Sequence, residues 1–428
     1  MGKIYTLTGN PFVDAGIYVI SELVEKEIEE IEPEDLRDLY PEIVDLYFTP
    51  GWRRMLYSIF PNHPVTHTTG SPKKYREFLD ELFSDLKPLG SSGTCVACGR
   101  RDKTSVERRY GIGRDLVPLT GSAEFVNFFP MGSLGLEMCS ACLLVIQFMP
   151  IFLHYCGGKF LLLHSNSSKV SRYWARNCVY NYHKQVSLNN FTGCYSSDFR
   201  DPVNSFFRSI EDIIIKYDEN WIDEDAFIRF YYFSNYGQSP SVEIFDVPTP
   251  VFRFLAYVKQ ANAYGDWKEM IEENYLNGKN EIYNKLLKNE SIVRYFFDKG
   301  RKIKGNWELL KFYLKEVREM NEKWINLIRE LGDKIAEIIK SLDSIKRLRQ
   351  IEMAQSFSDF RGVLLRLERQ DAVRAGLKEP LIRFDDYVFI FADGAKVWNE
   401  VRDLLLFRIY ERLHDWLLER RVEEEVEE

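Results

Sequence analysis

The spacing of apolar residues predicts two regions of different secondary structure, with the change near residue 266. Before it, short helical stretches alternate with segments of strand character. Residues 17–31 carry apolar side chains on one helical face and glutamates on the other, which predicts an amphipathic helix that Pro33 ends. Two further helices are expected at residues 34–48 and 73–86.

Strand patterns appear later in the same region. Residues 159–164 and 241–245 are short runs dominated by apolar residues, and Pro248 and Pro250 interrupt the chain after the second run. Helices and strands therefore occur together here. We expect residues 1–265 to form a mixed α/β domain.

After residue 266, glycine and proline become rare and a helical period dominates. The clearest stripe has apolar residues at alternating steps of four and three. Its members are Trp324, Ile328, Leu331, Ile335, Ile338, Leu342 and Ile345. Residues 357–375 and 395–421 are predicted to be helical too. The sequence therefore predicts an α+β protein in which residues 266–428 form a C-terminal helical bundle.

Composition limits the classes of protein that remain. The chain has 428 residues, 45% of them hydrophobic, which favours two or three domains. With 57 basic and 65 acidic residues its net charge is −8, so nucleic acid could bind only at local basic patches. The most apolar stretch, residues 138–156, is interrupted by Gln147, Pro150 and His154, and we expect a buried segment rather than a membrane span. A cytoplasmic protein is the expectation.

The cysteines provide the strongest chemical signal. Of seven in the chain, four form two Cys-x-x-Cys pairs, Cys95 with Cys98 and Cys139 with Cys142. A Cys-x-x-Cys turn presents two thiolates along one edge of a tetrahedron, and two such turns complete a four-sulfur zinc site. Because four protein ligands leave no open position, we expect one structural zinc ion, held in an insert at residues 88–145. The remaining readings are an iron–sulfur cluster, separate redox motifs and buried unpaired thiols.

Sequence motifs of catalysis are absent. The chain contains no His-Glu-x-x-His, no phosphate-binding Gly-x-x-x-x-Gly-Lys and no Gly-x-Ser-x-Gly. Gly111 and Gly113 begin a dinucleotide-binding pattern, but Leu116 stands where its third glycine is required. We therefore expect a protein that is not an enzyme.

Candidate nucleic-acid contacts come from local charge and from proline-framed loops. Beside the first cysteine pair lie Arg100, Arg101, Lys103, Arg108 and Arg109. A second group consists of Arg53, Arg54, Asn62, His63, Lys73 and Lys74. Basic side chains bind phosphates, and asparagine can read base edges in a groove. For both groups, ordinary surface loops and turns remain the alternative.

Basic residues also accumulate in the predicted bundle. They crowd the end of one helix and continue on the next, at Lys340, Lys346, Arg347, Arg349, Arg361, Arg366, Arg369 and Arg374. Such residues can track single-stranded nucleic acid, or they can simply complement the negative ends of helices. The sequence leaves both readings open.

Several segments together resemble a known family. Besides the two cysteine pairs, they are Thr8–Gly16 (Thr-Gly-Asn-Pro-Phe-Val-Asp-Ala-Gly), residues 118–122, residues 127–130 and residues 398–404. In this order they resemble the CRISPR-associated CXXC–CXXC family, the large subunits of Cascade, the RNA-guided surveillance complex, in type I-B systems of the Cst subtype. The resemblance extends over essentially the whole length.

The resemblance implies a non-catalytic large subunit that acts in antiviral defence. Such a subunit helps recognise the PAM, the short motif that flanks the target, helps unwind target DNA and recruits the helicase-nuclease. Implied partners are the guide 5′-end-binding, backbone and small subunits, CRISPR RNA and double-stranded target DNA with a PAM. The C-terminal bundle would correspond to a small-subunit-like domain. The alternatives are a metal-dependent nucleic-acid-processing enzyme and a zinc-ribbon protein-interaction adaptor.

Overall fold

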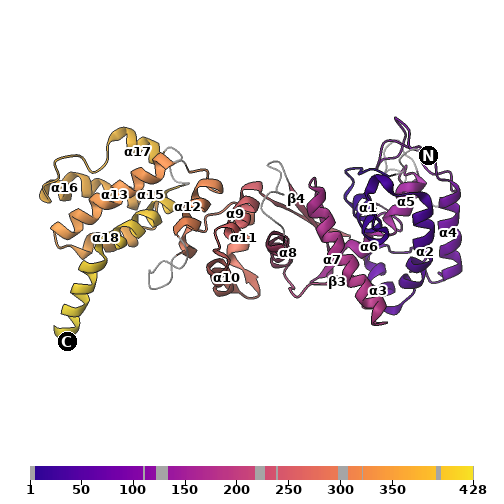
Figure 1. Ribbon diagram of the computed structural model, residues 1–428. Coiled ribbons are helices and arrows are strands. Elements are labelled where there is room, and N and C mark those ends of the chain that lie inside the picture. The colour runs from indigo at the N-terminus through magenta and orange to yellow at the C-terminus, as the bar shows by residue number, and fades with distance from the viewer. Residues whose placement is uncertain are drawn as a thin grey trace. The chain divides into compact units, whose positions relative to one another are not determined.

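The computed structural model describes residues 5–427 except 109–110, 122–133, 217–226, 238–239, 297–306, 321 and 392–396, and side chains except those of 215–216, 307–308 and 420–427. The chain forms two compact units (Figure 1). One comprises Met1–Phe252 and Leu276–Tyr283, and the other comprises Arg253–Tyr275 and Asn284–Glu428. The expected boundary at residue 265 instead falls inside the helix α10 (Tyr264–Glu273).

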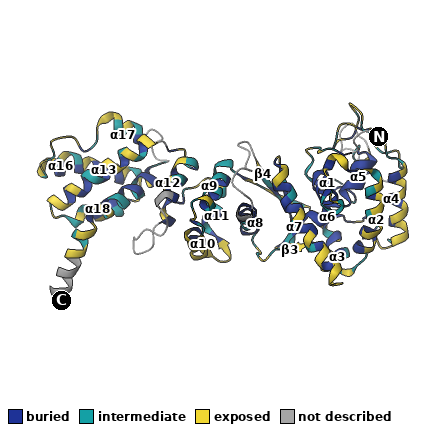
Figure 2. Ribbon diagram, in the orientation of Figure 1, coloured by how far each residue is buried: buried dark blue, intermediate teal, exposed yellow. Residues whose placement is uncertain are grey.

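Helices dominate the first unit. They are α1 (Pro11–Val24), η1 (Ile28–Glu30), α2 (Pro33–Tyr47), α3 (Pro50–Ile59), α4 (Pro72–Ser84), α5 (Ser140–Ile146), α6 (Met149–Phe152), α7 (Ser168–Ser187) and α8 (Pro202–Lys216). α2 and α4 confirm the helices expected at residues 34–48 and 73–86. Residues 138–156 form α5, α6 and the first strand, and most of their side chains are buried (Figure 2).

The first helix differs from its prediction. The expected helix at residues 17–31 instead begins at Pro11, where the Asn10 side chain accepts hydrogen bonds from two backbone N–H groups. It ends at Val24, because Glu25 adopts a left-handed conformation with φ of 56°. Pro33 then begins α2 rather than ending α1. Phe12 to Ser21 are all buried, so the N-terminal part of α1 has no polar face for a periodic pattern to reveal.

A five-stranded sheet completes the first unit. Its strands are β1 (His154–Cys156), β2 (Lys159–Ser165), β3 (Tyr195–Ser196), β4 (Ile228–Ser234) and β5 (Ser241–Val247), in the spatial order β3-β1-β2-β4-β5. Neighbours are antiparallel except β1 and β3. β2 and β5 confirm both predicted strands.

Helices cover both faces of this sheet. Phe12 of α1 packs edge-on against Phe233 of β4. On the opposite face, Phe206 of α8 stacks on Phe230 of β4. Because neighbouring residues of a strand point to opposite faces, these contacts place α1 and α8 in separate layers.

The described part of the second unit is almost entirely helical. Its helices are α10, η4 (Val293–Phe296), α12 (Trp307–Glu316), α13 (Glu322–Ser341), α14 (Ile345–Glu352), α15 (Phe357–Arg366), η5 (Leu367–Asp371), α16 (Ala372–Arg374), α17 (Phe384–Ile390) and α18 (Trp398–Glu427). Three elements contain the boundaries between the units: α9 (Thr249–Gln260), β6 (Tyr275–Leu276) and α11 (Glu281–Leu287). The strand β7 (Lys279–Asn280) lies within the first unit. The α+β class is confirmed. The first five residues of the predicted apolar stripe, Trp324 to Ile338, lie on the buried face of α13. The last two do not belong to this helix: Leu342 follows its end and Ile345 begins α14, and both are half-buried.

Two arginine–carboxylate pairs lie within this bundle. Arg318 contacts Glu400, and Arg347 contacts Asp371, with nitrogen–oxygen distances of 2.8 and 2.7 Å. Both carboxylates are almost fully buried, so each requires its arginine to offset the loss of hydration. Among the described residues, no helix combines the length and the apolar character that a membrane span requires.

Candidate metal centre

A tight turn shapes the first cysteine pair. The Gly99 N–H donates to the Cys95 carbonyl at 2.8 Å, and Gly99 has a φ of 60°, which a glycine adopts without strain. The Cys95 N–H donates to the Arg101 carbonyl at 2.9 Å, closing a small hairpin. Cys95 is buried and Cys98 is partly exposed, so this pair lies at the surface with its sulfurs turned inward.

The second pair begins a helix. Cys139 is the N-cap of α5, and its sulfur accepts a hydrogen bond from the Cys142 N–H at 3.5 Å. Because residues three apart lie on the same face of a helical turn, the Cys139 and Cys142 thiols point to the same side of α5.

Backbone hydrogen bonds bring together two pairs that are far apart in sequence. The Val96 N–H donates to the Glu137 carbonyl at 2.8 Å, and the Thr104 N–H donates to the Met138 carbonyl at 2.9 Å. The strand-like segment before Cys139 is thereby fixed against the first hairpin. The relative position of the two turns is set by the backbone itself.

The four cysteines form one cluster. The Cys98 and Cys139 sulfurs are 3.9 Å apart, and all four sulfurs lie within 4.8 Å of one another. Such a group can hold a metal ion. With four protein ligands a tetrahedral ion has no position left for water or substrate, so a metal here would stabilise the fold rather than activate a nucleophile.

A family comparison addresses this segment. A family model described as "CRISPR-associated protein (Cas_CXXC_CXXC)" matches residues 89–153. This match supports the CRISPR-associated CXXC–CXXC family. It contains both cysteine pairs and α5, the parts that build the cluster, and it supports a role in CRISPR defence. Comparison with curated proteins and with solved structures found no match.

The thiols cannot all ionise without a cation. Hydrogen bonding with the Cys139 thiol lowers the pKa of Cys98 and raises the pKa of Cys142. Charge is therefore shared unequally, because several thiolates at this separation repel one another. A divalent ion removes that repulsion, so metal binding would release protons from the cluster.

Asp85 braces the cluster from outside. Its carboxylate accepts hydrogen bonds from the Ser105 hydroxyl, the Ser140 hydroxyl at 2.6 Å, the Thr104 hydroxyl at 2.8 Å and the Ser105 N–H at 2.9 Å. Burial raises the pKa of Asp85, but these hydrogen bonds outweigh it and lower the pKa to about 2. One carboxylate thus connects the end of α4, the segment after the first hairpin and the residue between Cys139 and Cys142. No motif in the sequence indicated this role.

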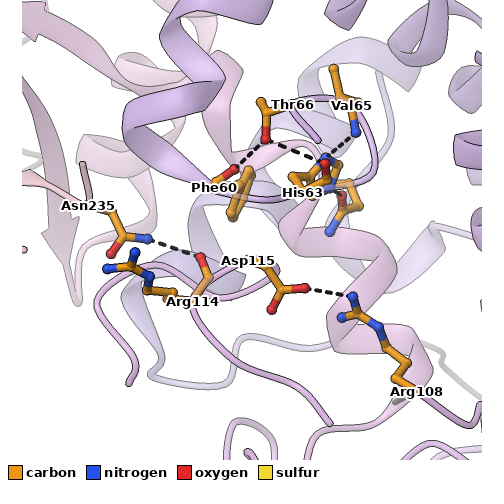
Figure 3. Close-up of polar contacts among 9 residues, drawn as sticks. Phe60, His63, Val65, Thr66, Arg108, Arg114, Asp115 and Asn235 are labelled. Carbon is orange, nitrogen blue, oxygen red and sulfur yellow. Dashed lines mark hydrogen bonds and ion pairs between the residues drawn. The ribbon is translucent and has the colours of Figure 1, made fainter. Parts of the chain in front are cut away.

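The structure corrects two predicted nucleic-acid contacts, His63 and Arg101. Both are buried, and neither presents a surface to a large ligand. The Val65 N–H donates to His63 Nδ1 at 3.2 Å (Figure 3). Nε2 therefore carries the proton and donates to the Gln147 side chain at 2.8 Å. Arg101 donates from Nε to the Lys87 carbonyl at 2.9 Å. These side chains hold the fold together.

Other residues of the predicted basic patch are also engaged locally. Lys103 pairs with Glu137 at 2.8 Å, and Arg108 pairs with Asp115 at 2.6 Å (Figure 3). Arg100 is exposed and donates to the Thr6 hydroxyl at 2.6 Å. Arg109 lies outside the described residues. Most basic side chains beside the first cysteine pair therefore bond to other residues of the same chain.

The second predicted group divides by exposure. Arg54, Asn62, Lys73 and Lys74 are exposed, whereas Arg53 is partly buried, 5.8 Å from the centre of the Phe48 ring. Asn62 lies in the loop after α3, where its backbone adopts the left-handed conformation with φ of 64°. Lys73 and Lys74 lie in the first turn of α4.

We expect mild acid to destabilise the first unit. Burial lowers the pKa of both His63 and His154 to about 3. The unfolded chain protonates these histidines near pH 6.5, so between pH 6.5 and 3 the unfolded state binds more protons. The free energy of unfolding should therefore fall with pH, by up to about 1.4 kcal/mol per pH unit for each histidine.

Thermal melts between pH 7.5 and 4.5 measure this slope. His63→Gln should make stability depend less steeply on pH, whatever its effect at pH 7.5. Loss of metal in acid contributes to the slope of both proteins, so the difference between the variant and the unchanged chain isolates the histidine. The exposed His67 provides the matched control, because His67→Gln removes a histidine that water reaches in both states. A slope that His63→Gln leaves unaltered would contradict the assignment.

Proposed function

We propose that the cysteine cluster binds one structural zinc ion. A tetrahedral ion with zinc–sulfur distances of about 2.3 Å separates its sulfurs by about 3.8 Å. The separation of 3.9 Å between Cys98 and Cys139 fits that edge. Four cysteine ligands also suit iron, and metal analysis of the purified chain distinguishes the two.

We further propose that the chain is the non-catalytic large subunit of a type I-B Cascade of the Cst subtype. The observation that carries this proposal is the family match across both cysteine pairs. The closed ligand set supports the absence of catalysis at this site, since it leaves no place for an activated water. The segment Thr8–Gly16, which resembles the family's opening signature, contributes the cap and first half of α1.

In this proposal the chain acts in the cytoplasm as part of an RNA–protein assembly. Its partners are the guide 5′-end-binding, backbone and small subunits and CRISPR RNA. The assembly recognises the PAM, unwinds target DNA and recruits the helicase-nuclease in antiviral defence. The second unit, with its helical bundle, takes the role of the small-subunit-like domain.

For target DNA we propose contact with the exposed members of the predicted group, Arg54, Asn62, Lys73 and Lys74. Their exposure supports this choice, and the burial of His63 and Arg101 removes those two. Because the whole chain is acidic, binding depends on a few such side chains.

The decisive experiment is co-expression of the tagged chain with the neighbouring CRISPR subunits and a CRISPR array. We expect the purified assembly to contain guide RNA, and the chain alone to leave DNA and RNA intact with magnesium or manganese. In the assembly, Lys73→Ala with Lys74→Ala should weaken DNA binding. The slope of the logarithm of the binding constant against the logarithm of salt concentration should become shallower by about 0.9 per lost phosphate contact. Lys311→Ala with Lys315→Ala, on exposed α12 residues, is the matched control.

Each alternative has its own outcome. Metal-dependent cleavage by the chain alone would make it a nucleic-acid-processing enzyme. Protein partners without any guide RNA would make it an interaction adaptor. Equal loss of DNA binding in both lysine variants would remove Lys73 and Lys74 from the interface.

A further inference from the structure

One helical segment of the second unit presents an unusual outer surface. α15, η5 and α16 follow one another without a break from Phe357 to Arg374 (Figure 1). The inner face is buried and consists of Phe360, Val363, Leu364, Leu367, Asp371 and Ala372. Exposed residues occupy the opposite side, so the segment lies on the bundle with one face in solvent (Figure 2).

Four exposed residues on this side are spaced four apart. They are Arg361, Leu365, Arg369 and Val373, which we call the outer row. Basic and aliphatic residues alternate along it, and the aliphatic side chains are strongly exposed, Leu365 by 61% and Val373 by 74%. The row therefore offers a ligand both positive charge and apolar surface, in alternation along one side of the segment.

The π turn in η5 keeps the outer row straight. In a regular α-helix, residues four apart drift by about 40° at each step, so three steps would carry Val373 about 120° away from Arg361. A π turn is wound more loosely by one residue, which reverses the drift over Leu367–Asp371. Arg347 of α14 pairs with the buried Asp371 at the end of that turn.

The arginines on this surface have no acidic partner among the residues that the structure describes. Among the described residues, no carboxylate lies within ion-pair distance of Arg361, Arg366, Arg369 or Arg374; Arg361 lies 5.9 Å from the centre of the Phe357 ring. Two carboxylates of this region, Glu368 and Asp359, bond instead to the Ile382 N–H and the Ser356 hydroxyl, and they are outnumbered by the four arginines. Elsewhere in the bundle, Arg402 and Arg408 are paired with carboxylates. This surface is therefore locally positive in an acidic chain.

We propose that the outer row binds an amphipathic helix of a partner protein whose contact face alternates acidic and aliphatic residues. Carboxylates of such a helix would pair with Arg361 and Arg369, and its aliphatic residues would cover Leu365 and Val373. Charge complementarity selects the acidic partner. The aliphatic positions favour a protein helix over nucleic acid, because a phosphate backbone offers nothing to cover them.

A labelled synthetic peptide tests the proposal with the full chain. The peptide is an alanine- and glutamine-based helix of about twenty residues, long enough to fold, with glutamate and leucine alternating along one face. Fluorescence anisotropy should show binding at micromolar concentration. R361E with R369E should weaken binding at least tenfold, whereas R366E with R374E, which changes the same charge on an adjacent row, should weaken it less than threefold.

Two further measurements separate the outer row from general attraction. L365Q with V373Q removes apolar surface without changing charge and should also weaken binding at least tenfold. A peptide with lysine in place of glutamate should bind the unchanged chain poorly and the R361E and R369E variant better. Melting curves show whether each variant is folded.

Three results would overturn the proposal. One is no peptide binding at about 1 mM, and another is equal loss in the two arginine variants. The third is tight binding of a single-stranded oligonucleotide that is lost in R361E with R369E while the peptide fails to compete. That last result would assign the row to nucleic acid.

Discussion

Replacing Cys95 and Cys139 together by serine should release the bound metal and unfold the segment that joins the two cysteine pairs. Each pair loses one of its two ligands, and a serine hydroxyl does not ionise to replace a thiolate. Because the binding free energy of a structural metal is folding free energy, we expect a loss of at least ~3 kcal/mol. The melting temperature should fall by roughly 10 °C.

Metal content per chain, measured by mass spectrometry, and a thermal melt test this prediction. Cys156→Ser with Cys194→Ser is the matched control. Both cysteines are buried outside the cluster and donate to backbone carbonyls of Phe199 and Pro150, as serine can also do. This control should keep its full metal content. A metal-free native chain, or a Cys95 and Cys139 variant that retains metal, would contradict the assignment of the site.

The cysteine cluster could be predicted because its chemistry is local. Two residues between paired thiols fix each half of the site, and four thiols near one another suit few groups other than a metal. What joins the halves could not be predicted. The hydrogen bonds from Val96 to Glu137 and from Thr104 to Met138 connect residues that no sequence pattern relates.

Exposure was the least predictable property of the candidate nucleic-acid residues. The loop Pro61-Asn62-His63-Pro64 has the composition of a surface turn, yet His63 is fully buried and Asn62 is exposed. His63 is buried because Gln147, between α5 and α6, offers it a hydrogen-bond acceptor. Because Gln147 is far from the loop in sequence, nothing near the loop indicates that His63 has a buried partner. From the sequence alone, Asn62 and His63 were therefore expected to be equally exposed.

Helix boundaries were predictable where capping is local. Ser71 accepts from the Lys74 N–H and Pro72 follows it, so α4 begins where those residues indicate. α1 was misplaced because burial on all sides removes the amphipathic period. The π turn at Leu367–Asp371 was equally hidden, since the ion pair at its end joins Asp371 to Arg347 of another helix.

Gly16→Ala should also disturb the metal centre, although Gly16 touches no cysteine. A Cβ at Gly16 would lie 2.2 Å from the carbonyl oxygen of Val145, well inside contact distance. Val145 belongs to α5, the helix whose first turn carries Cys142. Backbone atoms cannot turn aside as a side chain can, so α1 and α5 must separate. We expect a loss of at least ~2 kcal/mol.

Gly362 provides a control at which alanine should raise stability instead of lowering it. It also lies within a helix, but a Cβ there would meet no atom within 4 Å. Gly362→Ala should therefore raise stability by about 1 kcal/mol through helix propensity alone. Melting temperature and the rate of metal loss to a chelator measure both variants. Only Gly16→Ala should accelerate metal loss, because α1 packs against α5, the short helix capped by Cys139. An unchanged rate would show that α5 holds its cysteines without support from α1.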